Sequence, residues 1–386
     1  MQLNLELDNP SSFYTNLDFV SGKVFLTLNG DENVSAITVK LEGESNTMLL
    51  RPVPQYERHR HHRRDEMAGP AHEYHKILYK TEQVFPPQQH MTGRQSSQSY
   101  TLPAGVHQYQ FRLKIPFNNS CASHTQSVNF PFGGLMAFPS PGQVLYHHKT
   151  NTLPPSLTGF PNQAEIRYYV KVTVKRPSFL KENRRTQVGF KFLPIEPPRA
   201  PPSQAEAFAR RSHDFGAVSA QGMFRRRSNP PPGRLPAVRV DARLPLLKDQ
   251  PAAVLTCNEP VLLRILVQKQ AESPERVFLV SFQISLIGET QVRAQEVCRM
   301  ETRPWVVASQ HNLVIPISDP ADPVGTEKPI SSNLWDQIPL PRTVTPSFDI
   351  CNLTRTYTLE VSLVIGYGRP GRINVFVPCT LHYTMD

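Results

Sequence analysis

Apolar and polar side chains alternate at every second residue in many short stretches, and this pattern strongly constrains the fold. It is clear over residues 3–7, 24–28, 109–115 and 166–174, and it returns over residues 357–363. Successive side chains of a β-strand point to opposite faces of a sheet, so this period is typical of half-buried strands. The sequence therefore predicts an all-β protein made of many short strands.

Proline content and a change in composition divide the chain into two predicted lobes. The 386 residues include 38 prolines, about twice the usual share of ~5 %. Proline disfavours helix interiors and central strands, so it marks turns, edges and linkers. Residues 196–236 combine clustered prolines and arginines with little apolar periodicity, which predicts a flexible linker. We therefore expect two tandem β-sandwich lobes, over residues 1–195 and 237–386.

Two local features of the first lobe follow from breaks in the alternation. Residues 44–75 interrupt the pattern and contain prolines and an Arg/His run, so they are predicted as a long loop. Gly22 is predicted where one strand turns into the next, because a permissive backbone helps there.

Cysteine usage and the N-terminal sequence favour a cytoplasmic protein. The N-terminus lacks a basic region followed by a long apolar run, and no stretch is long and apolar enough for a membrane span. The cysteines form no Cys-x-x-Cys pair and are predicted as isolated, buried, reduced thiols. They are Cys121, Cys257, Cys298, Cys351 and Cys379.

The net charge of +10 is concentrated in residues 51–66 and in the predicted linker. Basic loops more often contact anionic membranes than read bases, and the signature modules of nucleic-acid binding are missing, so no nucleic-acid partner is expected. Metal binding by His59, His61 and His62 is disfavoured, because the arginines between and beside them repel a cation. No metal or cofactor is expected. The predicted lipid or cargo contacts are Arg58, Arg60, Arg63 and Arg64.

Several phrases, in the same order across both lobes, resemble the α-arrestins, which are arrestin-domain-containing trafficking adaptors of a fungal type. The resemblance implies two immunoglobulin-like β-sandwiches forming one scaffold. The phrases are GKV at 22–24, LEG at 41–43, LPAG at 102–105 with Phe111, LPPS at 153–156, IRYYVKV at 166–172, IPLP at 338–341, TPSF at 345–348 and RTYTLEV at 355–361.

The same resemblance implies an adaptor that links transporters or receptors at the plasma membrane or endosomes to a ubiquitin ligase and endocytosis. Such adaptors engage WW domains of HECT-type ligases through Pro-Pro-x-Tyr motifs, and this sequence contains none. The nearest substitute is Val53, Pro54, Gln55 and Tyr56, where an extended proline segment presents a tyrosine.

A second candidate motif is Arg225, Ser228 and Pro230 within the predicted linker. Arginine three residues before a serine suits basophilic kinases, and Arg-x-x-Ser-x-Pro approximates a 14-3-3 binding motif once phosphorylated. The phosphate adds negative charge and acceptor oxygens that an arginine cluster of a reader can bind.

Catalytic signatures are absent from the sequence: it has no GxSxG, HExxH or P-loop motif. We therefore expect a non-enzymatic adaptor with no catalytic residues. Two alternatives stay open at this point. One is an arrestin-fold sorting scaffold, retromer-like, that acts without a ubiquitin ligase. The other is a β-sandwich carbohydrate-active enzyme.

Overall fold

The computed structural model places the chain in two compact units, each described here by itself. The residues that the structure describes are 1–8, 12–52, 69–87, 99–119, 121, 151–160, 162–178, 182–195, 202–215, 237–248, 252–273, 275–367 and 369–382. Unit 1 comprises Met1–Ile195, Gln291–Glu301 and Phe348–Thr354, and unit 2 comprises Glu196–Thr290, Thr302–Ser347 and Arg355–Asp386.

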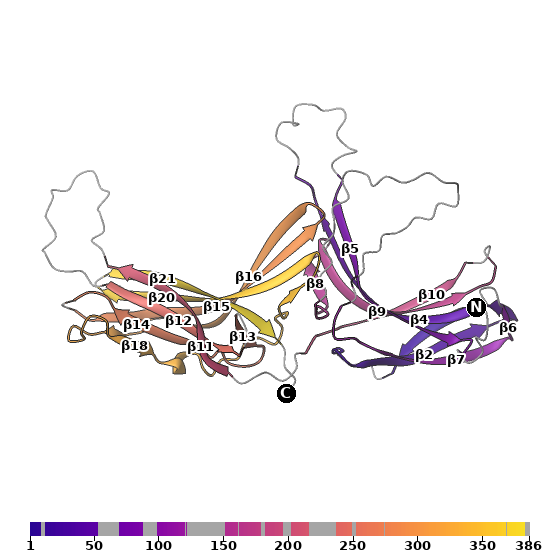
Figure 1. Cartoon of the computed structure of the whole chain (residues 1–386), viewed down its shortest axis with the longest axis horizontal. Coiled ribbons are helices and arrows are strands. Elements are labelled where there is room, and N and C mark those ends of the chain that lie inside the picture. Colours follow the sequence, from indigo (N-terminus) through magenta and orange to yellow (C-terminus); the bar gives the residue numbers. More distant parts are fainter. Residues whose placement is uncertain are drawn as a thin grey trace, which may run out of the picture. The chain divides into compact units, whose positions relative to one another are not determined.

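Unit 1 contains two main antiparallel sheets and a short two-stranded one (Figure 1). The three-stranded sheet has the order β1-β2-β7, the five-stranded sheet has the order β10-β9-β4-β5 with β8 paired to β9, and β3 pairs with β6. The strands are β1 (Gln2–Leu7), β2 (Phe19–Leu28), β3 (Glu32–Val34), β4 (Ala36–Leu49), β5 (Ala71–Phe85), β6 (Tyr100–Leu102), β7 (Gly105–Lys114), β8 (Leu157–Phe160), β9 (Ala164–Lys175) and β10 (Arg184–Phe190).

Unit 2 is built on a four-stranded sheet of order β11-β12-β14-β18 and a seven-stranded sheet (Figure 1). The larger sheet has the order β13-β21-β20-β15-β16, with β17 paired to β15 and β19 paired to β20. The elements are β11 (Pro202–Asp214), β12 (Ala237–Leu247), β13 (Ala253–Thr256), β14 (Arg264–Lys269), β15 (Val277–Ala294), β16 (Val297–Gln310), β17 (Ile315–Ser318), β18 (Glu327–Ile330), the short 3₁₀ helix η3 (Ser332–Leu334), β19 (Phe348–Asp349), β20 (Leu353–Tyr367) and β21 (Arg369–His382). Of these, β19, the end of β15 and the beginnings of β16 and β20 fall within residues 291–301 and 348–354 and so belong to unit 1.

The period-two pattern predicted from the sequence is confirmed by burial along the strands. In β2, Val24, Leu26 and Leu28 are buried, while Phe25 and Thr27 between them are only partly so. Each unit has its own apolar cluster, and the predicted all-β fold is confirmed. Among the described residues, no helix combines the length and apolar character needed to span a membrane.

The predicted loop over residues 44–75 is partly wrong. The strand β4 continues to Leu49, β5 begins at Ala71, and the two pair in antiparallel register from one end to the other. The alternation fails here because buried polar side chains replace apolar ones at the ends of both strands. Polar residues can occupy core positions when their hydrogen bonds are satisfied.

The predicted flexible linker over residues 196–236 also needs correction, because residues 202–214 form β11 beside β12. Ion pairs as well as apolar contacts hold this strand, since Ala207 and Ala209 pack against the core of unit 2. The guanidinium of Arg210 donates two hydrogen bonds of 2.8 Å to Asp241, which is buried on β12. Burial raises the pKa of Asp241, but bonds from Arg210 and Arg243 outweigh that effect and lower it.

Gly22 does not lie at a turn, which corrects the prediction for that residue. It sits inside β2, opposite Leu7 of β1 and Phe111 of β7. A Cβ atom at Gly22 would lie 2.2 Å from the carbonyl oxygen of Glu6 and 2.9 Å from the ring of Phe111. The glycine is required for close packing, not for backbone flexibility.

Replacing Gly22 by alanine is therefore expected to lower the free energy of unfolding by about 1–3 kcal/mol, the usual cost of overpacking. Urea denaturation of the full chain measures this loss. Gly30→Ala is the matched control, because a Cβ at Gly30 meets nothing within 4 Å. Equal stability of the two variants would contradict the packing role of Gly22.

Candidate functional site

A cluster of buried polar residues lies at one end of the five-stranded sheet of unit 1. On β4 the cluster includes Ser45 and Thr47, and on β5 it includes Glu73 and His75, all at most 4 % exposed. Buried polar groups are stable only when they are hydrogen-bonded, so the partners of these side chains define the site.

Glu73 is the centre of this cluster, and both of its carboxylate oxygens are satisfied. Oε1 accepts hydrogen bonds from Arg293 (2.8 Å) and lies 2.7 Å from Nε2 of His75. Oε2 accepts the backbone N–H of Gln295 at 2.8 Å. Gln295 has a left-handed backbone (φ 56°) and begins the turn between β15 and β16. We use the name Glu73 cluster for Ser45, Thr47, Glu73, His75, Arg293 and Gln295, together with the residues that they contact, which are Cys121, Cys351 and Asn352.

Arg293 connects Glu73 to a second distant segment of unit 1. Its guanidinium also donates to the carbonyl oxygen of Cys351 at 2.5 Å, and its backbone N–H donates to the carbonyl of Asn352 at 2.9 Å. The side chain of Asn352 in turn bonds Ser45 (2.7 Å) and Thr47 (3.2 Å). Three segments of unit 1 that are far apart in sequence therefore meet at one network.

Two thiols face His75 at the edge of the same cluster. The Sγ atom of Cys121 lies 3.4 Å from Nδ1 of His75 and 3.7 Å from Sγ of Cys351. Burial lowers the pKa of His75, but hydrogen bonds with Cys351 and Glu73 outweigh that effect and raise it to about 9. The hydrogen bond with Cys351, together with burial, raises the pKa of the Cys121 thiol.

The structure thus corrects the prediction of isolated, buried cysteines. Cys121 and Cys351 are neighbours in space although they are far apart in sequence, and Cys121 is only partly buried. Cys298 is exposed, whereas Cys257 and Cys379 are buried.

A second cluster of polar side chains, centred on Glu44, lies nearby on β4, β5 and β9. Glu44 accepts hydrogen bonds from Tyr74 (2.5 Å), from Tyr169 and from Arg167 (3.0 Å). Burial raises the pKa of Glu44, but these bonds outweigh it and lower the pKa. Lys76 forms an ion pair with Glu42 beside it.

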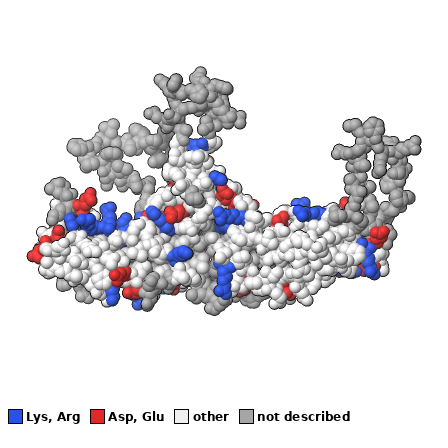
Figure 2. Space-filling view, turned by 180° about the vertical axis from the view of Figure 1, so that it is seen from behind, with Lys and Arg blue, Asp and Glu red and all other residues white. Residues whose placement is uncertain are grey.

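Acidic and basic side chains also lie next to each other at several places on the visible surface, much of which is uncharged (Figure 2).

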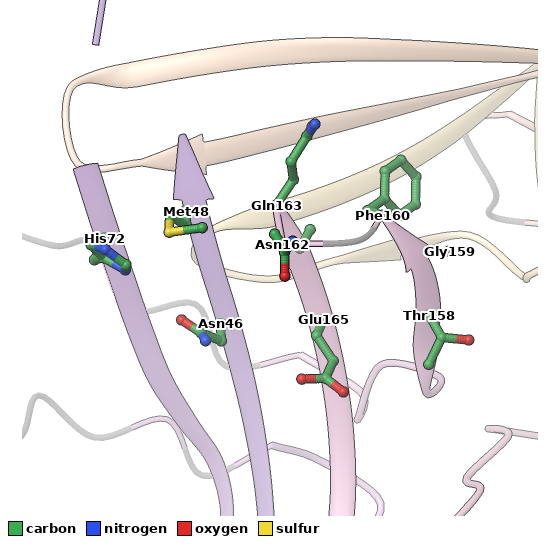
Figure 3. Close-up of a pocket in the computed structure, with 10 residues that line it drawn as sticks. Asn46, Met48, His72, Thr158, Gly159, Phe160, Asn162, Gln163 and Glu165 are labelled. Atoms are coloured by element: carbon green, nitrogen blue, oxygen red, sulfur yellow. The ribbon is translucent and has the colours of Figure 1, made fainter. Parts of the chain in front are cut away.

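An open groove of about 610 Å³ runs over the ends of β4, β5, β8 and β9 in unit 1. The figure shows Asn46 and Met48 on β4, His72 on β5, and Thr158 and Phe160 on β8 around it (Figure 3). Gly159 (φ 108°) and Asn162 (φ 59°) take left-handed conformations in the β8–β9 segment that forms one wall. Amide, hydroxyl and apolar side chains mix in this lining, as in sites that hold an extended peptide.

The candidate residues from the sequence analysis all lie outside the described residues. They are Val53, Pro54, Gln55, Tyr56, Arg58, Arg60, Arg63, Arg64, Arg225, Ser228 and Pro230.

Sequence reasoning missed the Glu73 cluster for a definable reason. Ser45, Thr47, Glu73 and His75 fall within the stretch predicted as a loop, and their partners come from residues 291–301 and 348–354. One signal was present in the sequence: polar residues continue the every-second-residue spacing, as at Ser45 and Thr47 and again at Glu73 and His75.

The architecture of unit 1 agrees with a comparison to known families. The family model described as arrestin (or S-antigen), N-terminal domain, matches residues 3–194. The chain is an arrestin-domain protein. A search of curated proteins finds no match to it. In this arrestin-domain protein, the matched region contains β4, β5, β8 and β9, and thus all the residues that line the groove and the part of the Glu73 cluster on β4 and β5.

Arg293→Met is expected to lower the free energy of unfolding by about 3–5 kcal/mol, because it removes the guanidinium that pairs with the buried carboxylate of Glu73. Urea denaturation measures the loss. The double variant Glu73→Gln with Arg293→Met is expected to recover part of it, since the uncompensated charge is then absent.

Arg51→Met is the matched control for this prediction. Arg51 pairs with Glu296 in the same turn that Glu73 contacts and also donates to the side chain of Gln295, but the paired side chains are 33 % and 56 % exposed, far more than Glu73. Exposed pairs contribute about 0–1 kcal/mol. Equal losses for Arg293→Met and Arg51→Met would refute the buried-charge explanation.

Proposed function

We propose that this arrestin-domain protein is a non-enzymatic adaptor that binds segments of membrane transporters or receptors and brings them to trafficking machinery. The observation that carries the proposal is the arrestin N-terminal domain over residues 3–194. Trafficking and adaptor roles are general in arrestin-domain proteins, and this chain carries that domain.

We propose the groove of unit 1 as the cargo-binding surface. Its lining offers amide groups that can bond a peptide backbone and apolar side chains that can receive alternate peptide side chains. Asn46, His72 and Thr158 are exposed there, so a ligand can reach them without rearrangement of the core. The groove is open, which suits a short extended segment better than a small enclosed ligand.

The proposed contact with a WW-domain ubiquitin ligase remains the segment with Val53, Pro54 and Tyr56, and Ser228 remains the proposed phosphorylation site. The support for both comes from the sequence. A tyrosine beside a proline can fill an aromatic-lined WW groove, and a phosphate after arginine provides a 14-3-3 motif.

Affinity capture of the tagged full chain after crosslinking in cells, with partners identified by mass spectrometry, tests the proposal. Wild type is expected to capture membrane transporters or receptors. Thr158→Arg places a long cation in the groove and is expected to reduce this capture by about tenfold or more, a change of ~1.4 kcal/mol. Gln108→Arg, exposed on β7 outside the groove, is the matched control and should leave capture unchanged.

The same capture experiments distinguish which trafficking partners this protein brings to its cargo. Tyr56→Ala should lose a WW-domain ligase while it keeps the cargo, and phosphopeptides that cover Ser228 should carry phosphate. Coat or sorting subunits without any ligase would favour a sorting scaffold instead. Capture that contains no membrane protein, or that is identical for Thr158→Arg and wild type, would contradict the cargo site.

A further inference from the structure

Three side chains of unit 1 point metal-ligating atoms at one another within the Glu73 cluster. The ring nitrogens of His75 and the sulfurs of Cys121 and Cys351 come from three separate parts of the chain, and one ligand atom from each lies within 4.8 Å of the other two. Thiolate and imidazole are the ligands that zinc prefers in proteins. We infer that His75, Cys121 and Cys351 form a zinc site.

Two of the three separations between these atoms match tetrahedral zinc coordination, and the third is within 4.8 Å. A tetrahedral zinc with Zn–S bonds of about 2.3 Å and a Zn–N bond of about 2.0 Å holds two sulfurs roughly 3.8 Å apart and a sulfur and a nitrogen roughly 3.5 Å apart. The distance between Sγ of Cys121 and Sγ of Cys351 is 3.7 Å, and that between Sγ of Cys121 and Nδ1 of His75 is 3.4 Å. Binding therefore needs little movement of the ligands.

The other side of the imidazole is arranged as in known metal sites. Metal-bound histidines almost always donate their second ring N–H to a carboxylate or carbonyl, which fixes the tautomer. Nε2 of His75 lies 2.7 Å from Oε1 of Glu73, and Arg293 and the N–H of Gln295 hold that carboxylate in place. Donation from Nε2 to Glu73 leaves the lone pair of Nδ1 directed toward the thiols.

The charges around the site also balance when zinc is bound. Two thiolates offset the two charges of the ion, and Arg293 offsets Glu73. Buried charges are stable only when they are paired or coordinate a metal, so this balance favours the loaded cluster. Binding displaces the protons of the two thiols and also the Nδ1 proton that His75 carries when its imidazole is protonated. Three protein ligands leave the fourth tetrahedral position to a water molecule.

Metal analysis of the full chain tests this site directly. Protein purified under reducing conditions and dialysed against metal-free buffer is expected to retain about one zinc ion per chain, the stoichiometry of a single site. Cobalt in place of zinc should give the thiolate-to-cobalt charge-transfer band and the visible bands of tetrahedral coordination. Cys121→Ser should lose the zinc and the charge-transfer band, whereas Cys298→Ser, which changes an exposed thiol, should keep both.

A measurement on the wild type protects the test against a variant that fails to fold. Bound zinc should slow alkylation of Cys121 and Cys351, and removal of zinc by a chelator should speed it, with no change at Cys298. Glu73→Gln should weaken zinc binding by about 10–100-fold, the usual effect of losing an outer-shell carboxylate.

Three results would overturn the inference. The first is wild-type protein with no zinc and no cobalt charge-transfer band. The second is zinc retained equally by Cys121→Ser, which would place the ligands elsewhere. The third is recovery of Cys121 and Cys351 as a disulfide with no zinc bound.

Discussion

Burial of the Glu73 carboxylate is the constraint on which the rest of unit 1 depends. A carboxylate that is 3 % exposed must be paired and hydrogen-bonded, or the fold would lose several kcal/mol, on the order of the effective penalty for one buried ion. Its partners are Arg293, the N–H of Gln295 and His75. Because two of these come from residues 291–301, the carboxylate fixes that segment in the unit, and Arg293 then fixes the carbonyl of Cys351.

This network explains why the chemistry of unit 1 lies where it does. The bond from Arg293 to Cys351 holds the 348–354 segment against β4 and β5, and Cys351 thereby comes next to Cys121 and His75. The proposed zinc site is thus a consequence of the same buried charge. The proposed cargo groove lies over the same ends of β4 and β5, so its walls rest on strands that the network holds in register.

Much of the fold could be predicted from the sequence, because strand burial depends on a local pattern. The alternation at residues 166–174 predicts the side chains that β9 buries. The pattern failed where polar groups are buried, as in Thr47 and Glu73, and where a strand is held by ion pairs, as between Arg210 and Asp241. A polar residue in the core cannot be told from a loop residue without its partner.

The candidate site could not be predicted for the same physical reason. His75, Cys121 and Cys351 are separated by long stretches of sequence, and no spacing rule joins them. Only folding brings their ligand atoms together. The motifs proposed from the sequence, around Tyr56 and Ser228, consist of short segments of the kind that partners read, so a sequence can propose them without a fold.

Hydrogen exchange of the full chain, measured by mass spectrometry for wild type and Glu73→Gln, tests the central claim most directly. The account predicts that peptides covering residues 291–301 and 348–354 exchange about tenfold faster or more in the variant, a change of ~1.4 kcal/mol, while β12 of unit 2 is unchanged. Equal protection of both segments in the two proteins would show that the Glu73 carboxylate does not hold them, and would contradict the account.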